Sequence, residues 1–87
     1  MTEAEMYREA AAILRRDGWC RIHLTDEKGR HCLFGALQKS NAVLDATKLY
    51  EIIGAWNAMI FNDTECSSAD DAIAILEIAA DLATPSP

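Results

Sequence analysis

Apolar residues at helical spacing dominate residues 3–17 and set the fold class of this chain. The segment opens with a capping box formed by Thr2 and Glu5, and Gly18 supplies the positive φ that ends a helix. Between these signals one apolar stripe follows i, i+4, i+7 and i+8 spacing, made of Met6, Ala10, Ile13 and Leu14, with Tyr7 and Ala11 beside them. The sequence therefore predicts a helix over 3–17 with one buried face.

A second apolar segment covers residues 32–37 and has two small residues, Gly35 and Ala36, in its middle. Glycine costs about 1 kcal/mol in a helix interior relative to alanine. Its presence therefore indicates that another backbone approaches closely at this point. The segment predicts a short helix near the centre of the fold.

The longest apolar stripe lies over residues 45–61 and predicts a third helix. Its apolar members are Leu49, Ile52, Ile53, Trp56, Met59 and Ile60. Asn62 and Asp63 are expected to end it, because asparagine often takes the left-handed position after a helix. Ser68, which precedes acidic residues, predicts the N-cap of a fourth helix over 68–83.

The region between the first two helices alternates with period two instead. Residues 19–24 predict a short strand, 26–29 a turn with Gly29 at positive φ, and 30–32 a returning strand. Two short strands are marginal alone, so this hairpin is expected to lie against the helices.

A chain of 87 residues has room for one hydrophobic core. We expect a single domain over 1–83 and a frayed tail over 84–87. The fold class predicted is mostly α with minor β. It is a compact bundle of about four helices, the second one short, with a two-stranded β-hairpin between helices 1 and 2.

Charge is distributed unevenly in this acidic chain of net charge −6. Residues 45–87 hold eight acidic residues and only Lys48 as a basic one. A phosphate backbone is repelled by such a surface, and the third and fourth helices offer no basic recognition face, so nucleic-acid binding is not expected. The acidic half is interpreted as a solvated surface, with binding of a basic partner or nucleic-acid mimicry as the alternative.

The chain has three cysteines, an odd number, and their spacing is not that of a disulfide-bonded secreted domain. We therefore expect reduced thiols. No basic-then-apolar signal and no apolar run of spanning length is present. We expect a cytoplasmic protein in a bacterial host, with no membrane contact.

Four side chains of the predicted hairpin suggest a metal or thiol site: Cys20, His23, His31 and Cys32. Thiolate and imidazole are zinc ligands, and Cys32 near a helix start could act as a nucleophile. Period-two alternation, however, sends Cys20 and His23 to opposite faces. The preferred interpretation is two buried thiols and two solvated or hydrogen-bonded imidazoles, with no cofactor, no metal and no catalytic residue. A small metal- or thiol-dependent enzyme is the alternative.

The fourth helix carries a second apolar stripe, Ile75, Ile78 and Leu82, beside the one that faces the core. A helix of a small domain has little reason to be apolar on two sides unless something covers the second side. Either the core wraps around this helix, or the stripe is an interface with a protein partner or a second copy of the chain.

Several of these residues together resemble a small domain-of-unknown-function family of actinobacteria and their phages. The residues that carry the resemblance are Gly18, Trp19, Gly29, Arg30, Cys32, Leu33, Gly35, Ala36, Leu37, Asn62 and Asp63, followed by the Ala-rich last helix. The loop over 64–66 departs from the pattern because it lacks an arginine. The resemblance implies a phage-encoded protein that binds or inhibits a host protein. The motif itself is interpreted as structural, with Asp63 accepting hydrogen bonds from the hairpin backbone or from Arg30.

Overall fold

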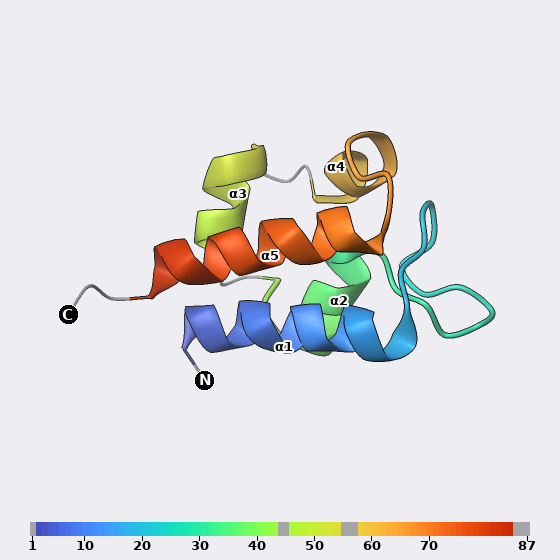
Figure 1. The fold of residues 1–87 in the computed structure, drawn as a ribbon, viewed down its shortest axis with the longest axis horizontal. Helices are drawn as coiled ribbons and strands as arrows, with labels where there is room; N and C mark the ends of the chain where they lie inside the picture. Colours follow the sequence, from blue (N-terminus) through green and yellow to red (C-terminus); the bar gives the residue numbers. More distant parts are fainter. Residues whose placement is uncertain (1, 44–45, 55–57, 85–87) are drawn as a thin grey trace.

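The computed structural model describes residues 2–43, 46–54 and 58–84. Helices account for most of this part of the chain: α1 Glu3–Asp17, α2 Leu33–Lys39, α3 Thr47–Ile53, α4 Ala58–Thr64 and α5 Ala69–Ala83 (Figure 1). The prediction of a mostly helical bundle is confirmed. The number of helices is different from the four expected, since five are found in the described residues.

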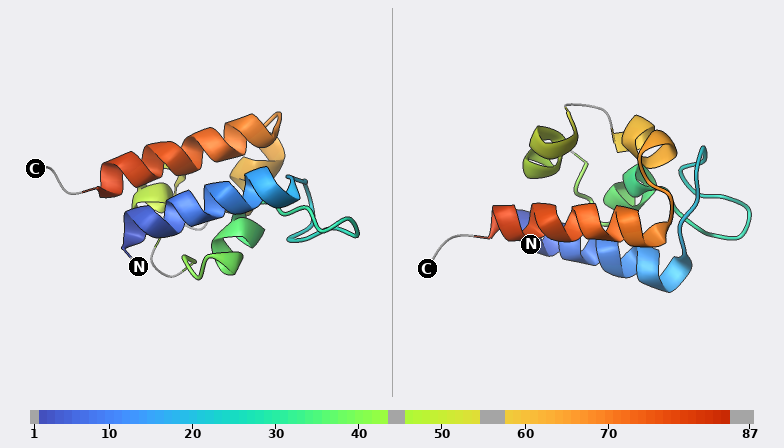
Figure 2. Two further views of the ribbon diagram at one scale, coloured as in Figure 1. Left: turned by 60° about the horizontal axis from the view of Figure 1, so that its bottom comes forward. Right: turned by 45° about the horizontal axis from the view of Figure 1, so that its top comes forward.

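Helices α1 and α5 form the base of the fold and run antiparallel side by side (Figures 1 and 2). Helix α2 packs on α1. In the view of Figure 1, α3 and α4 lie on the side of α5 that faces away from α1. The predicted bounds of the first helix are confirmed to the residue. Thr2 and Glu5 form the capping box, and the Gly18 N–H, at φ 95°, donates to the Leu14 carbonyl over 2.9 Å.

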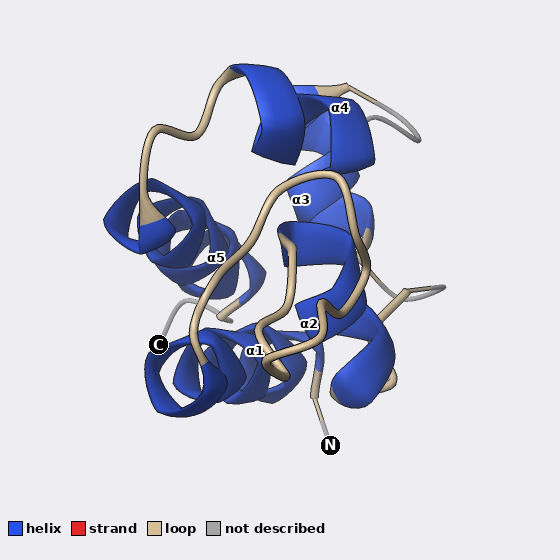
Figure 3. Cartoon of the chain, turned by 90° about the vertical axis from the view of Figure 1, so that its right-hand side faces the viewer, coloured by secondary structure: helices blue, strands red, loops and turns tan. Residues whose placement is uncertain are grey.

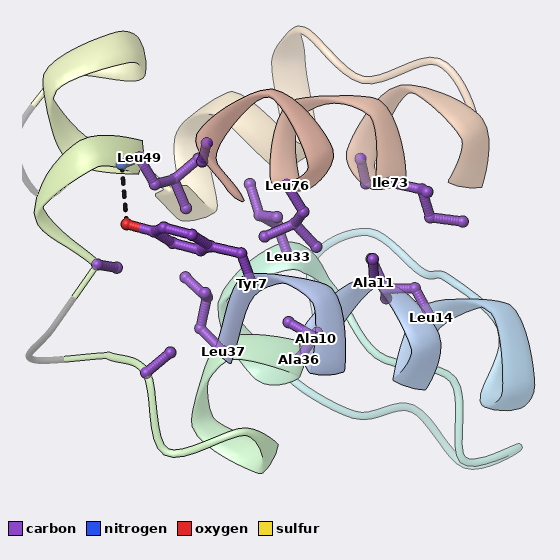
Figure 4. Packing of buried hydrophobic residues seen from close by; sticks show 14 of the residues in the cluster. Tyr7, Ala10, Ala11, Leu14, Leu33, Ala36, Leu37, Leu49, Ile73 and Leu76 are labelled. Atoms are coloured by element: carbon purple, nitrogen blue, oxygen red, sulfur yellow. Dashed lines mark hydrogen bonds between the residues drawn. The ribbon is translucent and has the colours of Figure 1, made fainter. Parts of the chain in front are cut away.

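The core fills the space between these helices (Figure 4). Its fully buried large side chains include Tyr7, Leu14, Leu33, Leu37, Leu49 and Leu76, surrounded by alanines that let the helices approach one another. Leu76 of α5 and Leu33 of α2 lie near each other in the middle of the cluster (Figure 4). The stripe predicted on the first helix faces this core, with only Met6 partly exposed.

The start of α3 is held by α1, not by a capping residue of its own. Ala46 makes no side-chain cap, and the free N–H groups of the first turn find partners elsewhere. Lys48 N–H donates to Glu3 Oε2 over 3.0 Å, and Leu49 N–H donates to the Tyr7 hydroxyl over 3.1 Å (Figure 4). Orphan donors at a helix N-terminus need such acceptors, so Glu3 and Tyr7 fix where α3 begins.

The single helix expected over 45–61 is two short helices in the structure. Gly54 has φ 90° and ends α3, and α4 begins at Ala58. A positive φ breaks the α-helical backbone, and glycine adopts it at little cost. Trp56 of the predicted stripe lies outside the described residues. Three other members are exposed rather than buried, namely Ile52, Met59 and Ile60.

The predicted hairpin is wrong as well. Residues 18–32, here named the Gly18–Cys32 loop, contain isolated bridges from His31 to Trp19 and Thr25 but no strand (Figure 3). The apolar residues that alternate over 20–24 do not share one buried face either, because Cys20 is buried whereas Ile22 is 75% exposed. The loop runs along the end of the helical bundle, where two side chains of α4 and a backbone carbonyl of the segment after it hold it in place.

The two longest helices in the described residues, α1 and α5, have 15 residues each. A helix needs about 20 residues to cross the hydrocarbon core of a bilayer. None of the described helices is therefore long enough to span a membrane. Of the tail expected to fray, residues 85–87 are outside the described part, while the Thr84 hydroxyl donates to the Ala80 carbonyl.

Candidate functional site

The apolar stripe predicted on the last helix lies on α5 at the solvent boundary. Ile78 is 50% exposed and Leu82 is 57% exposed, whereas Ile75 is partly buried and packs against the core. The three residues and Asp71 follow the i, i+3, i+4 spacing of one helix face. We name Ile75, Ile78 and Leu82 the α5 stripe. It is an apolar ridge preceded by a carboxylate, on a helix whose opposite face is buried.

A second candidate region is the Gly18–Cys32 loop, which one buried side chain holds in place. Asn62 of α4 is fully buried. Its Oδ1 accepts from Trp19 Nε1–H at 2.6 Å and from Leu33 N–H at 2.9 Å. Its amide nitrogen donates to the Cys20 carbonyl at 3.1 Å. One asparagine therefore connects the start of the loop, the start of α2 and the end of α4.

Asp63 and Cys66 hold the tip of the same loop. The Asp63 carboxylate accepts from Ile22 N–H at 3.0 Å, and the Arg21 guanidinium donates to the Cys66 carbonyl. The Asn62 amide also donates to this carboxylate, over 3.0 Å, and the bonds from Ile22 and Asn62 lower the pKa of Asp63. Of the two donors expected for Asp63, a backbone N–H of this segment is the one found, that of Ile22. The other, Arg30, pairs with Asp26, its Nε donating over 2.6 Å.

Ile22 has an uncommon backbone conformation. Its φ is 75°, and His23 N–H donates to the Arg21 carbonyl over 2.8 Å, which closes a three-residue γ-turn. The γ-turn with positive φ is the rare and strained form, and a β-branched residue is especially disfavoured there. The turn nevertheless places an isoleucine side chain in solvent, 75% exposed.

His31 closes the base of the loop. Its ring is 3% exposed, its Nε2–H donates to Asp17 Oδ2 over 2.9 Å, and Nδ1 is hydrogen-bonded to the Thr25 hydroxyl over 2.8 Å. Arg16 and then His31 lower the pKa of Asp17, because both bind its ionised form. The imidazole thus links the end of α1 to the middle of the loop.

The four side chains considered as a metal or thiol site are engaged separately. Cys20 Sγ donates to the His23 and Arg30 carbonyls, and Cys32 Sγ accepts from Gly35 N–H as the N-cap of α2. The His23 side chain is exposed, and no cluster of three metal-ligand residues occurs in 2–43, 46–54 or 58–84. Burial raises the pKa of Cys20 and Cys32, which keeps both as weakly nucleophilic thiols at neutral pH.

The small residue Gly35 of the apolar segment 32–37 allows a close backbone contact. A Cβ on Gly35 would collide with the backbone carbonyl of Leu24, so the loop lies directly on the first turn of α2. Sequence reasoning predicts such an approach, although the approaching backbone is a loop and not a helix. Ala36, Leu33 and Leu37 are fully buried beside it.

A cleft of about 540 Å³ opens between the limbs of the loop. Its lining consists mainly of polar and charged side chains: Trp19, Cys20, Arg21, His23, Thr25, Asp26, Glu27, Lys28 and Arg30. Arg21 lies over the Trp19 ring, with its guanidinium carbon 5.4 Å from the ring centroid. We name this feature the loop cleft. No sequence pattern indicates it directly, because the alternation over its limbs predicts paired strands.

The loop cleft also contains cations that form no ion pair with the described residues. Five of the eight basic side chains form ion pairs, namely Arg8, Arg15, Arg16, Arg30 and Lys48. The other three form none with the described residues, and two of them, Arg21 and Lys28, line the cleft. The third, Lys39, is exposed at the end of α2. The lining of the cleft therefore has a small positive excess on an acidic protein, with Arg21, Lys28 and Arg30 against Asp26 and Glu27.

These features define a small helical protein whose long, anchored loop presents a polar cleft at one end of the bundle. A family model described as a family of unknown function, DUF6197, matches residues 1–49, and the chain belongs to this family. The matched segment contains α1, the loop and α2 but ends before Asn62 and Asp63. Comparisons with curated proteins and with solved structures found no significant match.

Proposed function

We propose that this protein is a non-enzymatic module that binds another protein through the α5 stripe. The observation that carries the proposal is the exposure of Ile78 and Leu82, one helical turn apart, on a helix whose other face is in the core. Exposed apolar ridges with polar surroundings are typical of protein interfaces.

The charge of the surrounding half supports a partner of particular chemistry. Residues 45–87 have a net charge of −7, and Asp71 lies on the same face as the stripe. Two copies joined through this half would bring like charges together, which disfavours self-association. A partner with an apolar centre and a basic rim fits the charge better. The resemblance to proteins of actinobacteria and their phages supports a phage protein acting in the host cytoplasm, where this partner would be a host protein.

The test compares two exposed isoleucines. Ile78→Asp places a charge in the α5 stripe, and Ile60→Asp makes the same change on α4, where Ile60 is 61% exposed. We expect the wild-type protein and Ile60→Asp to retain the same bacterial proteins from a host lysate, identified by mass spectrometry, and Ile78→Asp to lose them. Binding of the purified partner should weaken as salt is raised.

Sedimentation velocity completes this test. If a partner occupies the stripe, the free protein remains a monomer at tens of micromolar. If the wild-type protein is instead a dimer and Ile78→Asp dissociates it, the stripe is occupied by a second copy of the chain and not by a different protein. Equal retention by all three proteins, together with monomers throughout, would refute the α5 stripe as an interface.

A further inference from the structure

We propose that the loop cleft binds an acidic segment of a protein, with carboxylates at Arg21 and Lys28 and an apolar side chain beside Ile22. This site is separate from the α5 stripe and does not depend on the function proposed for it. The stripe lies on α5, whereas the loop cleft is lined by residues of the Gly18–Cys32 loop. That loop is found at one end of the helical bundle (Figure 3).

The first argument is the conformation of Ile22. A strained γ-turn persists only when its surroundings hold it, and here the Asp63 carboxylate binds the Ile22 N–H. The conformation brings the folded protein no burial, because the isoleucine side chain is 75% exposed. Ile22 is not itself part of the cleft lining, but its two chain neighbours, Arg21 and His23, are. A strained residue that presents an apolar side chain to solvent is typical of a binding surface.

The second argument is charge. Asp26, one of the lining residues, accepts from Arg30 Nε and from the Lys28 and Arg30 backbone N–H groups, so its own charge is already matched. Neither Arg21 nor Lys28 forms an ion pair with the described residues, although Arg21 lies near enough to Asp63 to help lower the pKa of that carboxylate. Within the lining of the cleft, only Glu27 is left to oppose the two cations. An incoming carboxylate would therefore find Lys28 without an ion pair and Arg21 opposed by Asp63 alone, on a protein that is otherwise acidic.

The third argument is preorganisation. The Arg21 side chain is fixed by the Trp19 ring and by the Cys66 carbonyl. Trp19 is fixed in turn by Asn62, through the 2.6 Å bond from its indole N–H. Groups that are ordered before binding lose less conformational entropy when a ligand arrives. A nucleic acid is the weaker alternative, because two cations do not offset the repulsion of a chain with net charge −6.

A selection experiment tests the site directly, even though the natural partner is unidentified. The probe is a library of random twelve-residue peptides, displayed and selected on the immobilised full chain. We expect the selected peptides to be rich in Asp and Glu with at least one large apolar residue. A selection that yields no binder, or peptides without an acidic excess, would overturn the proposal.

Matched variants then locate the binding. Lys28→Glu should weaken the selected peptides by about tenfold or more, since a charge-assisted contact is replaced by repulsion. Lys39→Glu makes the same charge change outside the cleft and should weaken them less than about twofold. Equal effects of the two variants would indicate general electrostatic attraction and would overturn the site.

Ile22→Gly separates binding from folding. Glycine adopts a positive φ at little cost, so the variant should unfold at the same or a higher temperature than the wild type. It should nevertheless weaken the peptides several-fold, because the apolar contact is removed. Unchanged peptide binding would exclude a role for the strained turn. Ile78→Asp should leave peptide binding intact, which keeps this result independent of the α5 stripe.

Discussion

The α1–α5 pair and the Gly18–Cys32 loop are held in different ways. The two helices bury a continuous row of apolar side chains against each other, and many residues share the contribution. The loop buries few large side chains and depends on single polar groups of the C-terminal part, above all Asn62. Apolar packing is distributed and tolerant, whereas a polar network fails when one of its members is removed. Helical core and loop should therefore respond differently to substitution.

Leu76→Ala should have the largest effect. Leu76 is fully buried at the centre of the core, and truncation of such a leucine costs about 4 kcal/mol in the free energy of unfolding, within a usual range of about 2 to 5. Chemical denaturation followed by circular dichroism measures it. Arg15→Ala, which removes an exposed ion pair with Glu77, serves as the control and should cost less than about 1 kcal/mol.

Asn62→Ala should cost about 3 kcal/mol although it removes no large apolar group. Trp19 Nε1–H, Leu33 N–H and the Cys20 carbonyl lose their partner, at about 1 kcal/mol or more for each buried group. Hydrogen exchange should show loss of protection at the backbone N–H groups of Cys20, His31 and Cys32 before loss in α1 and α5. Uniform loss over the whole chain would mean that loop and helices unfold together.

Gly35→Ala should cost about 2 kcal/mol by forcing the loop away from α2. The added methyl group meets the Leu24 carbonyl, a backbone atom with little freedom to move. Gly29→Ala is the useful comparison, since Gly29 has φ 79° but open space around it, so only backbone strain is added there. If the Gly35 variant were as stable as the wild type, the close approach of the loop to α2 would be wrong.

Acid should open the loop before it unfolds the helices, and this is the smallest effect expected. The pKa of Asp63 is lowered from its ordinary 3.8 by Ile22 and Asn62, and the pKa of Asp17 is lowered by Arg16 and His31. A depressed pKa in the folded state contributes stability above the ordinary value, and this contribution is lost as pH falls below about 4. The indole N–H signal of Trp19 in NMR spectra would report the opening. Asp63→Asn does not titrate and should reduce the pH dependence.

The same division decides what can be predicted from the sequence. The first helix is predicted correctly because its signals, the capping box and Gly18, are local in the chain. The split of residues 45–61 is missed because the apolar spacing outweighs Gly54 in the prediction. Asn62 is expected at the end of a helix, yet it lies inside α4 with its side chain bonded to the loop. No local pattern reports bonds between residues 43 positions apart.

The α5 stripe follows from periodicity alone, since helical spacing separates the core-facing residues from Ile78 and Leu82. The loop cleft does not, because its geometry depends on Asp63, Cys66 and the γ-turn at Ile22. Alternation of apolar and polar residues over 19–24 is equally compatible with an irregular loop, because distant side chains can supply the hydrogen-bond partners that its backbone groups need. A long-range polar network therefore lies outside the reach of local patterns.

The order in which the ribosome makes this chain gives the loop anchors a further consequence. Trp19, Arg21 and Ile22 are synthesised well before their partners, which follow 43, 45 and 41 positions later. The N-terminal helix can form early, but the loop cannot take its final shape until α4 has been produced. Contacts across such separations slow folding, because distant parts of the chain must first meet. The cleft is thus completed late, and a nascent chain that stops before α4 would lack it.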